Sequence, residues 1–242
     1  MKYIVEISYV ASPKFCGWQI QKNKPTYQQA CEDVFAKVLG EKISLVASGR
    51  TDSGVSALKQ VAHFETSANV PSSFVGYVNS LLPEEIKVLS IRKTDGSFHA
   101  RFDAKDKTYK YYFYTSKNTV PYYDRFALHV RTNLDYDIMK KQLKHLLGEH
   151  DFSSFCASGS EVKDFVRTIY KAELNKVGDL YEFTICGNGF LYNMVRIIVG
   201  TLIDIGGGKI TSNMGEIIKS KNRANAGKTV GPEGLVLFDV TY

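Results

Sequence analysis

The sequence predicts an α+β protein built from two lobes. Segments of alternating or β-branched residues, and segments with apolar residues at helical spacing, occur in both halves of the 242-residue chain, as expected of strands that pack against helices. No Pro-rich or Gly/Ser-rich linker separates the halves. We therefore expect an N-terminal α/β lobe over residues 1–105 and a C-terminal α/β lobe over residues 106–242, packed tightly with a cleft between them.

The first lobe begins with a strand and a helix. Residues 2–10 alternate between apolar and other side chains, which predicts a strand. Thr26 followed by Gln29 predicts a capping box, and apolar residues then recur at helical spacing until Gly40. Further strands are expected at residues 43–47, 61–64 and 87–91, and a short helix at 72–80.

The second lobe opens with the run KTYKYYFYT, residues 107–115, whose aromatic and β-branched residues predict a strand. Asn133 or Asp135 can cap a helix that ends at Gly148. An apolar stripe from about Phe190 predicts a second helix, which the glycines at 206–208 stop. Further strands are expected at residues 166–172, 180–186 and 235–242, and a short helix from residue 212.

The composition favours a polyanionic partner. The formal net charge is +6, and basic proteins often bind nucleic acid. The 15 tyrosines and 14 phenylalanines can stack on bases where they are exposed beside basic residues, although most such rings belong to a core. Charge and aromatic content together are compatible with an RNA partner without identifying one.

Several classes of function lack their motifs. The chain has no phosphate-binding loop, no G-x-G-x-x-G after a strand, no G-x-S-x-G and no H-E-x-x-H. The four cysteines are far apart and form no C-x-x-C pair, which favours reduced thiols over a metal site. The N-terminus is typical of a strand rather than a signal peptide, and the longest apolar stretch is too short to span a bilayer. We expect a cytoplasmic protein with no cofactor and no metal.

The segment SGRTDSGVSA, residues 48–57, contains an Arg and an Asp among small residues. If its backbone is extended, Arg50 and Asp52 point to one side and Thr51 to the other, because side chains alternate along a strand. Asp52 is then a candidate catalytic carboxylate close to a guanidinium. The alternative interpretation is a turn in which Asp52 caps the backbone and makes a surface ion pair with Arg50.

Two further residues stand out. Arg196 interrupts an apolar helix, where a buried charge without a partner is costly; alternatively, its stem packs and its head reaches water. Tyr109 lies in the aromatic strand and is either a site residue or a packed strand residue.

Eight segments of the chain, in the same order, resemble the bacterial tRNA pseudouridine synthase A (TruA) family. They are GWQIQ (17–21), SGRTDSGVSA (48–57), QVAHF (60–64), NSLLPEEI (79–86), FHARFDAKDKTYKYYFY (98–114), HDFSSF (150–155), FLYNMVRIIVGTL (190–202) and PEGLVLFDV (232–240). The resemblance implies a pseudouridine synthase fold, in which two α/β lobes share a mainly antiparallel sheet with a central active-site cleft.

The resemblance also implies roles for five residues. Asp52 is the catalytic residue of the family motif G-R-T-D. Tyr109 lies against the target base, and Arg50 helps to displace or replace the flipped nucleotide. Arg196 pairs with the catalytic carboxylate, which favours its ionised form. Leu235 is an apolar residue of the pocket.

The implied function is isomerisation of uridine to pseudouridine in the anticodon stem-loop of tRNA, at tRNA positions 38–40, by a homodimer. The reaction breaks the bond from N1 to the sugar, rotates the uracil and links it again through C5, so it needs no redox change, metal or activated donor. The target base must leave the stack. The carboxylate acts either as a nucleophile at the sugar or as a base that removes a sugar proton, and both roles fit the sequence.

The chain departs from the family pattern at two places. Tyr9 is followed by Val-Ala where the family usually has Asp-Gly, and Ser56 stands where the family often has His. Two alternative functions stay open: a non-catalytic RNA-binding protein or folding chaperone on the same scaffold, and a pseudouridine synthase that acts on another RNA.

Overall fold

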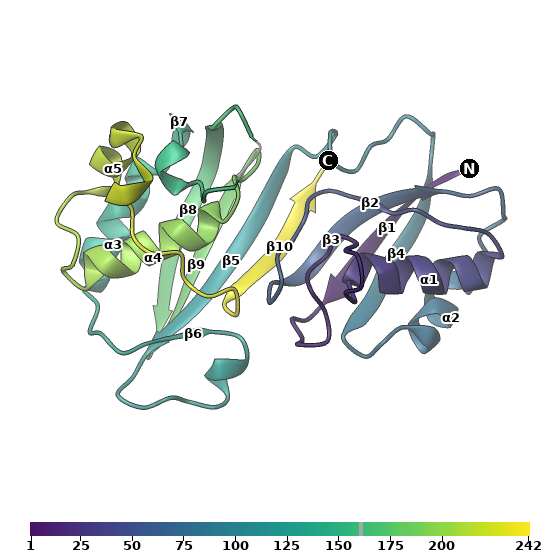
Figure 1. Cartoon of the computed structure of the whole chain (residues 1–242), viewed down its shortest axis with the longest axis horizontal. Helices are drawn as coiled ribbons and strands as arrows, with labels where there is room; N and C mark the ends of the chain where they lie inside the picture. Colours follow the sequence, from purple (N-terminus) through teal and green to yellow (C-terminus); the bar gives the residue numbers. More distant parts are fainter. Residues whose placement is uncertain (160–161) are drawn as a thin grey trace. The chain divides into compact units, whose positions relative to one another are not determined.

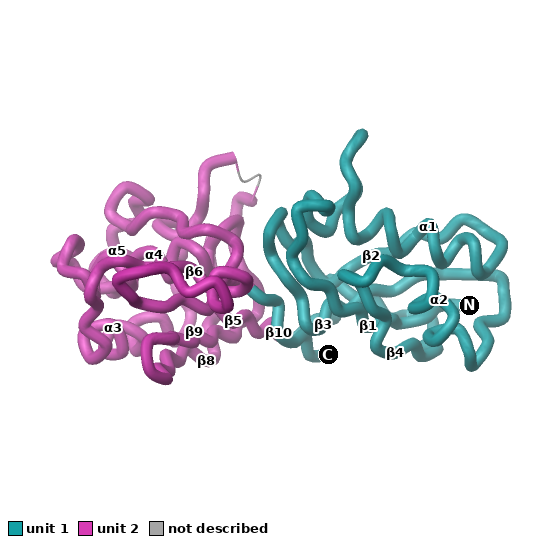
Figure 2. The backbone as a smooth tube through the Cα atoms, turned by 90° about the horizontal axis from the view of Figure 1, so that it is seen from below, with its two compact units in different colours: residues 1–105, 236–242 teal, residues 106–235 magenta. Residues whose placement is uncertain are grey.

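The structure is a computed structural model that describes residues 1–159 and 162–242 (Figure 1). The chain forms two compact units: unit 1 contains residues 1–105 and 236–242, and unit 2 contains residues 106–235 (Figure 2). Both units contain helices and strands, and the strands form a large, mainly antiparallel sheet. The predicted α+β class is therefore confirmed.

Unit 1 contains the strand order β4–β1–β3–β10. β1 pairs antiparallel with both β3 and β4, the short β2 pairs antiparallel with β3, and β10 runs parallel to β3 with Val236 opposite Ser56. The bounds of these strands are β1 (Lys2–Tyr9), β2 (Val46–Ala47), β3 (Ser56–Glu65), β4 (Ile86–Thr94) and β10 (Leu235–Thr241). The predicted second domain covers residues 106–242, whereas unit 2 ends at Leu235 and residues 236–242 belong to unit 1.

Two helices pack on the sheet of unit 1. They are α1 (Tyr27–Leu39) and α2 (Phe74–Leu81). Phe35 of α1 joins the layers, because its ring centroid lies 5.6 Å from that of Phe64 on β3 and 5.1 Å from that of Phe74 on α2. Only half of the predicted capping box forms: Thr26 Oγ1 accepts the backbone N–H of Gln29, while the side chain of Gln29 donates to Asp33.

Unit 2 contains the strand order β5–β9–β8–β7, in which neighbours are antiparallel, and β6 runs parallel to β5. Its strands are β5 (Asp106–Thr115), β6 (Leu128–Val130), β7 (Gly148–Asp151), β8 (Val166–Val177) and β9 (Leu180–Gly187). Its helices are α3 (Tyr136–Gln142), α4 (Met194–Gly206) and α5 (Met214–Ser220). Short 3-10 turns lie at Tyr123–Arg125, Leu143–His145, Ser153–Phe155 and Arg223–Asn225.

Two helix boundaries differ from the prediction. Asp135 caps α3, but the helix ends at Gln142 and a 3-10 turn follows, so Gly148 opens β7 rather than closing the helix. α4 begins at Met194 rather than near Phe190, because Asn193 has a left-handed backbone (φ 59°) that helical residues do not adopt. Among residues 1–159 and 162–242, no helix has the length and apolar character needed to cross a membrane.

Candidate active site

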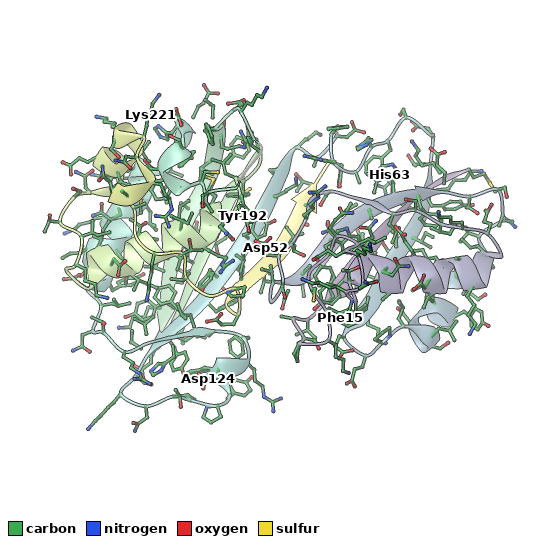
Figure 3. All side chains as sticks on the ribbon, in the orientation of Figure 1. Phe15, Asp52, His63, Asp124, Tyr192 and Lys221 are labelled. Carbon is green, nitrogen blue, oxygen red and sulfur yellow. The ribbon has the colours of Figure 1, made fainter. Side chains whose placement is uncertain are left out.

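The loop that carries Arg50 and Asp52 connects β2 to β3 in unit 1 (Figure 3). Burial alternates along it, since Arg50 is exposed, Thr51 is buried and Asp52 is half-buried. An extended backbone produces this alternation. After Asp52 the chain turns: the N–H of Val55 donates to the carbonyl oxygen of Asp52 at 3.2 Å, and Gly54 has a φ of 79°. The backbone of Asp52 thus closes the predicted turn.

A buried polar cluster lies beneath this loop, formed by Tyr9, Ser48, Thr51 and Gln60, and we call it the anchoring cluster. The Tyr9 hydroxyl is hydrogen-bonded to Thr51 Oγ1 at 2.7 Å. Ser48 Oγ donates to Gln60 Oε1 at 2.7 Å, and Gln60 Nε2 donates to the carbonyl oxygen of Gly49 at 2.9 Å. A buried polar group that loses its partner costs about 1–3 kcal/mol, so the cluster holds the loop in one position.

The segment before α1 packs against the same loop. Gly17 has a φ of 86°, and a Cβ atom there would lie 2.8 Å from the carbonyl oxygen of Thr51 and 3.0 Å from the nitrogen of Ser53. The N–H of Trp18 donates to that oxygen of Thr51 at 3.0 Å. Only glycine fits this backbone and this close approach, which gives a physical reason for the Gly-Trp pair of the GWQIQ segment.

Tyr109 and Arg196 lie in unit 2. Tyr109 is a half-buried residue of β5, and its ring meets the ring of Phe190 edge to face, with 5.2 Å between the centroids. Arg196 is the only residue of α4 that is not buried. Its Nε donates to the carbonyl oxygen of Val230 at 2.7 Å, and its Nη1 donates to Asn193 Oδ1 at 2.8 Å. These two bonds fix the plane of the guanidinium group.

Backbone carbonyl groups within residues 230–234 accept hydrogen bonds from side-chain and main-chain donors of unit 2. We call this stretch the anchoring segment. Gly231 accepts a hydrogen bond from the Tyr111 hydroxyl at 2.7 Å. Gly234 accepts one from the N–H of Tyr112 at 2.9 Å. Burial, and then the Glu233 carboxylate, raise the pKa of Tyr111, so this hydroxyl keeps its proton and acts as a donor. Leu235 follows the segment and is buried.

A cavity of about 370 Å³ in unit 2 shares Val230 and Gly231 with the anchoring segment. Three of the residues that line it are cationic: Arg131, Lys209 and Lys228. Among the described lining residues, the only carboxylate, on Asp204, lies 3.5 Å from Lys209 Nζ. The described lining of this cavity therefore carries more cationic than anionic side chains.

The structure places the five predicted site residues in two groups. Arg50 and Asp52 share one loop of unit 1. In unit 2, Arg196 donates a hydrogen bond to the anchoring segment, Leu235 directly follows that segment in the sequence, and Tyr109 lies on β5. The residues that hold them were not predicted. Gln60 carried one signal, since a polar residue at the head of the apolar strand QVAHF requires a partner when buried. In the described part of the chain, no three His, Cys, Asp or Glu side chains gather as metal ligands.

Several known proteins similar to this chain are named tRNA pseudouridine synthase A. A family described as tRNA pseudouridine synthase matches residues 143–242. The tRNA pseudouridine synthase A of Thermoanaerobacter sp. (strain X514) is 41% identical over 244 residues, which is 100% of both chains. That of Bacillus subtilis (strain 168) is 44% identical over 232 residues, which is 94% of both chains. A crystal structure of the archaeal box H/ACA sRNP Nop10–Cbf5 complex aligns with a TM-score of 0.40 and 15% identity over 84% of this chain and 43% of that chain, and nothing further follows from it. The chain belongs to the tRNA pseudouridine synthase A family.

Proposed function

We propose that this protein isomerises uridine to pseudouridine in the anticodon stem-loop of tRNA, at tRNA positions 38–40. The observation that carries the proposal is the 41% identity over the whole length of both chains to a tRNA pseudouridine synthase A. The net charge of +6 supports an RNA substrate, because phosphates dominate the affinity of such complexes.

We propose Asp52 as the catalytic residue. The bond between N1 of the uracil and C1′ of the ribose breaks, the uracil turns, and a bond forms between C5 and C1′. C5 loses its proton and N1 gains one, so the product is an isomer of the substrate. The loop of Asp52 rests on the anchoring cluster and on Gly17. A carboxylate on such a fixed loop needs little reorganisation when the base arrives.

Four residues are proposed to bind the substrate: Arg50, Tyr109, Arg196 and Leu235. Tyr109 offers an aromatic wall for the uracil, and the edge contact with Phe190 holds its ring. Leu235 adds a buried apolar side chain. Arg196 offers a guanidinium whose orientation is set by Val230 and Asn193. Arg50 is exposed and fits the task of occupying the place that the flipped nucleotide leaves.

The test is a comparison of the wild-type protein with Asp52→Asn on unmodified tRNA transcripts, with pseudouridines mapped by carbodiimide treatment and primer extension. Asp52→Asn is expected to bind tRNA and to form no pseudouridine. Asp33→Asn is the matched control, because Asp33 is exposed on α1 and accepts a hydrogen bond from Gln29. If Asp52→Asn converts uridine to pseudouridine at a rate near that of the wild type, Asp52 is not the catalytic residue.

We further propose that the protein is a cytoplasmic homodimer with tRNA as its partner. Light scattering of the purified protein tests the dimer, and a monomer at all concentrations contradicts it. The affinity for tRNA is expected to fall steeply with salt, since each neutralised phosphate releases counterions. Binding that does not change between low and high salt would contradict a phosphate-dominated complex.

A further inference from the structure

The loop between β4 and β5 presents an aromatic ring to solvent. Phe102 is 75% exposed, although phenylalanine is among the residues most often buried. Its ring lies 4.2 Å from the ring of His99, with 27° between the two planes. The guanidinium carbon of Arg101 lies 5.9 Å from the centroid of the Phe102 ring. We call the pair His99 and Phe102 the exposed stack.

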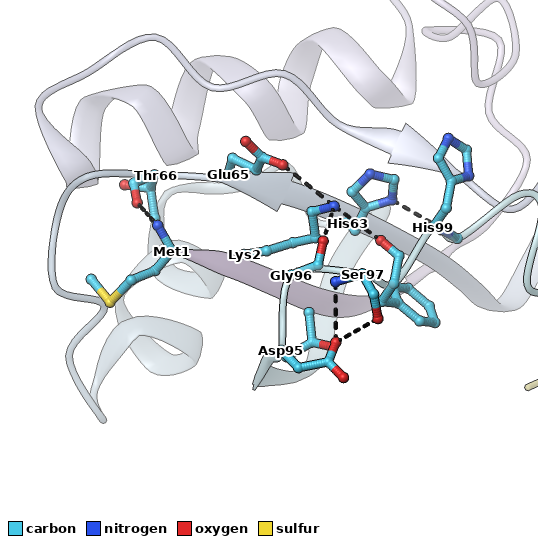
Figure 4. A network of polar contacts seen from close by, with 12 residues as sticks. Met1, Lys2, His63, Glu65, Thr66, Asp95, Gly96, Ser97 and His99 are labelled. Atoms are coloured by element: carbon cyan, nitrogen blue, oxygen red, sulfur yellow. Dashed lines mark hydrogen bonds and ion pairs between the residues drawn. The ribbon is translucent and has the colours of Figure 1, made fainter.

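A buried histidine supports the exposed stack from beneath. His63 lies on β3, and its ring centroid is 4.9 Å from that of His99 (Figure 4). His63 Nδ1 accepts the backbone N–H of Ala100 at 3.1 Å, so this ring nitrogen carries no proton. Burial, followed by the charge of His99, lowers the pKa of His63. Three rings thus lie in series from the sheet to the surface.

Hydrogen bonds also fix the backbone of the loop. The N–H of His99 donates to Asp103 Oδ2 at 2.7 Å, and His99 Nδ1 accepts the N–H of Phe102 at 3.3 Å. The hydroxyl of Tyr242 donates to the carbonyl oxygen of Ala100 at 2.7 Å. Lys2 Nζ donates to the carbonyl oxygen of Phe98 at 3.2 Å, a contact drawn in Figure 4. The loop backbone is therefore fixed before any ligand binds, and the contact with His99 orients the phenyl ring, which lowers the entropic cost of binding.

We propose that the exposed stack is a binding platform for an unpaired base of the RNA substrate. The identity of the ligand as RNA rests on the proposed function. An exposed ring offers a flat face, and every base has a π-face that stacks on such a ring. The Arg101 guanidinium, which lies over the ring, adds a cation that suits the phosphate joined to that base. The site would extend the contact with RNA beyond the base that reacts.

The test measures binding by fluorescence anisotropy with two probes, a labelled single-stranded RNA and the same RNA annealed to its complement. Phe102→Ala is expected to bind the single strand about 5- to 150-fold more weakly, since one stacked base contributes about 1–3 kcal/mol. Phe102→Trp keeps the affinity and Phe102→Leu loses it as the alanine variant does, because the contact needs an aromatic face. Binding of the duplex changes little in all three variants.

Tyr77→Ala is the matched control. Tyr77 is also in unit 1 and is 55% exposed on α2, and its removal is expected to leave both affinities unchanged. Equal binding by Phe102→Ala and the wild type overturns the proposal, as does wild-type affinity in Phe102→Leu. If Phe102→Ala keeps its affinity for RNA and instead changes the molar mass in light scattering, the stack is a contact between copies of this chain.

Pseudouridine mapping on the same proteins separates this proposal from the proposed function. Wild-type protein that forms no pseudouridine, together with weak binding of the single strand by Phe102→Ala, refutes the proposed function and leaves the platform in place. Wild-type protein that forms pseudouridine, together with unchanged RNA binding by Phe102→Ala, refutes the platform alone.

Discussion

The two groups of candidate site residues are held in opposite ways. In unit 1 the loop carries Asp52, and side chains on strands anchor it: Tyr9 from β1 and Gln60 from β3. In unit 2 a helix carries Arg196, and a loop supplies one of its two anchors, the carbonyl group of Val230. In unit 1, strands therefore fix the loop that carries Asp52. In unit 2, a loop helps to fix Arg196, which is a side chain of a helix.

This difference has an energetic consequence. Each anchor in unit 1 also has a buried partner that would lose its hydrogen bond, as when Ser48 loses Gln60. In unit 2, one anchor of Arg196 is the backbone carbonyl group of Val230, which substitutions do not remove, and the other is the half-buried side chain of Asn193. Changes to the anchors are therefore expected to move the Asp52 loop more than they move Arg196.

The largest effect is expected from Gly17→Ala. The new Cβ atom would lie 2.8 Å from the carbonyl oxygen of Thr51, so the loop must shift, and a shift of about 1 Å costs about 100-fold in rate. The measurement is the initial rate of pseudouridine formation on tRNA transcripts. Gly40→Ala separates the clash from backbone strain, because Gly40 also has a positive φ of 72° but has nothing within 4 Å of the new Cβ. Equal rates in the two variants would contradict the role of Gly17.

Gln60→Leu tests the anchoring cluster. The substitution leaves Ser48 Oγ and the carbonyl oxygen of Gly49 without their partner, so the free energy of unfolding is expected to fall by about 2–3 kcal/mol. Urea denaturation measures the change. Gln29→Leu is the control, since the hydrogen bond of Gln29 to Asp33 is exposed, and its effect is expected to stay within about 0.5 kcal/mol. Similar losses in both variants would show that the cluster adds nothing to the fold.

Tyr111→Phe makes the corresponding test in unit 2. It removes one hydrogen bond to the carbonyl oxygen of Gly231 and keeps the packed ring, so a loss of about 1 kcal/mol of unfolding free energy is expected. Urea denaturation measures this change as well. A loss of unfolding free energy as large as that of Gln60→Leu would contradict the expected difference between the anchors of the two units.

The smallest effect is a dependence of stability on pH that comes from His63 in unit 1. Burial, and then His99 and Lys2, lower the pKa of His63 in the folded protein. The unfolded chain therefore takes up the proton first. The contribution of neutral His63 to the free energy of unfolding is present above about pH 6.5, the ordinary pKa of histidine. It is lost as the pH falls through the folded-state pKa. His63→Gln is expected to lose less stability than the wild type on acidification, and an identical pH dependence would contradict this.

Local sequence patterns predicted the elements that depend on neighbouring residues. The alternation of residues 2–10 predicted β1, and Thr26 with Gly40 predicted both ends of α1. The start of α4 was wrong because a single residue, Asn193, has a left-handed backbone that its apolar neighbours do not reveal. The spacing of apolar residues predicts which face of a helix or strand is buried more reliably than it predicts the first residue of that element.

The candidate site was predicted only in part. The family resemblance proposed Asp52, Tyr109 and Arg196, and these roles stay predictions. The anchors were missed because their contacts join distant parts of the chain, as Tyr9 and Thr51 do. No local pattern in a single sequence marks such a pair.

The position of β10 has a consequence for the order of folding. Unit 2 is inserted in the sequence of unit 1, between β4 and β10. Because synthesis runs from the N-terminus and contiguous segments close their contacts sooner, the whole of unit 2 leaves the ribosome before β3 can gain its parallel neighbour. Val236 then pairs with Ser56, close after the turn that carries Asp52. The strand that follows the Asp52 loop therefore obtains its parallel partner only after unit 2 has been synthesised.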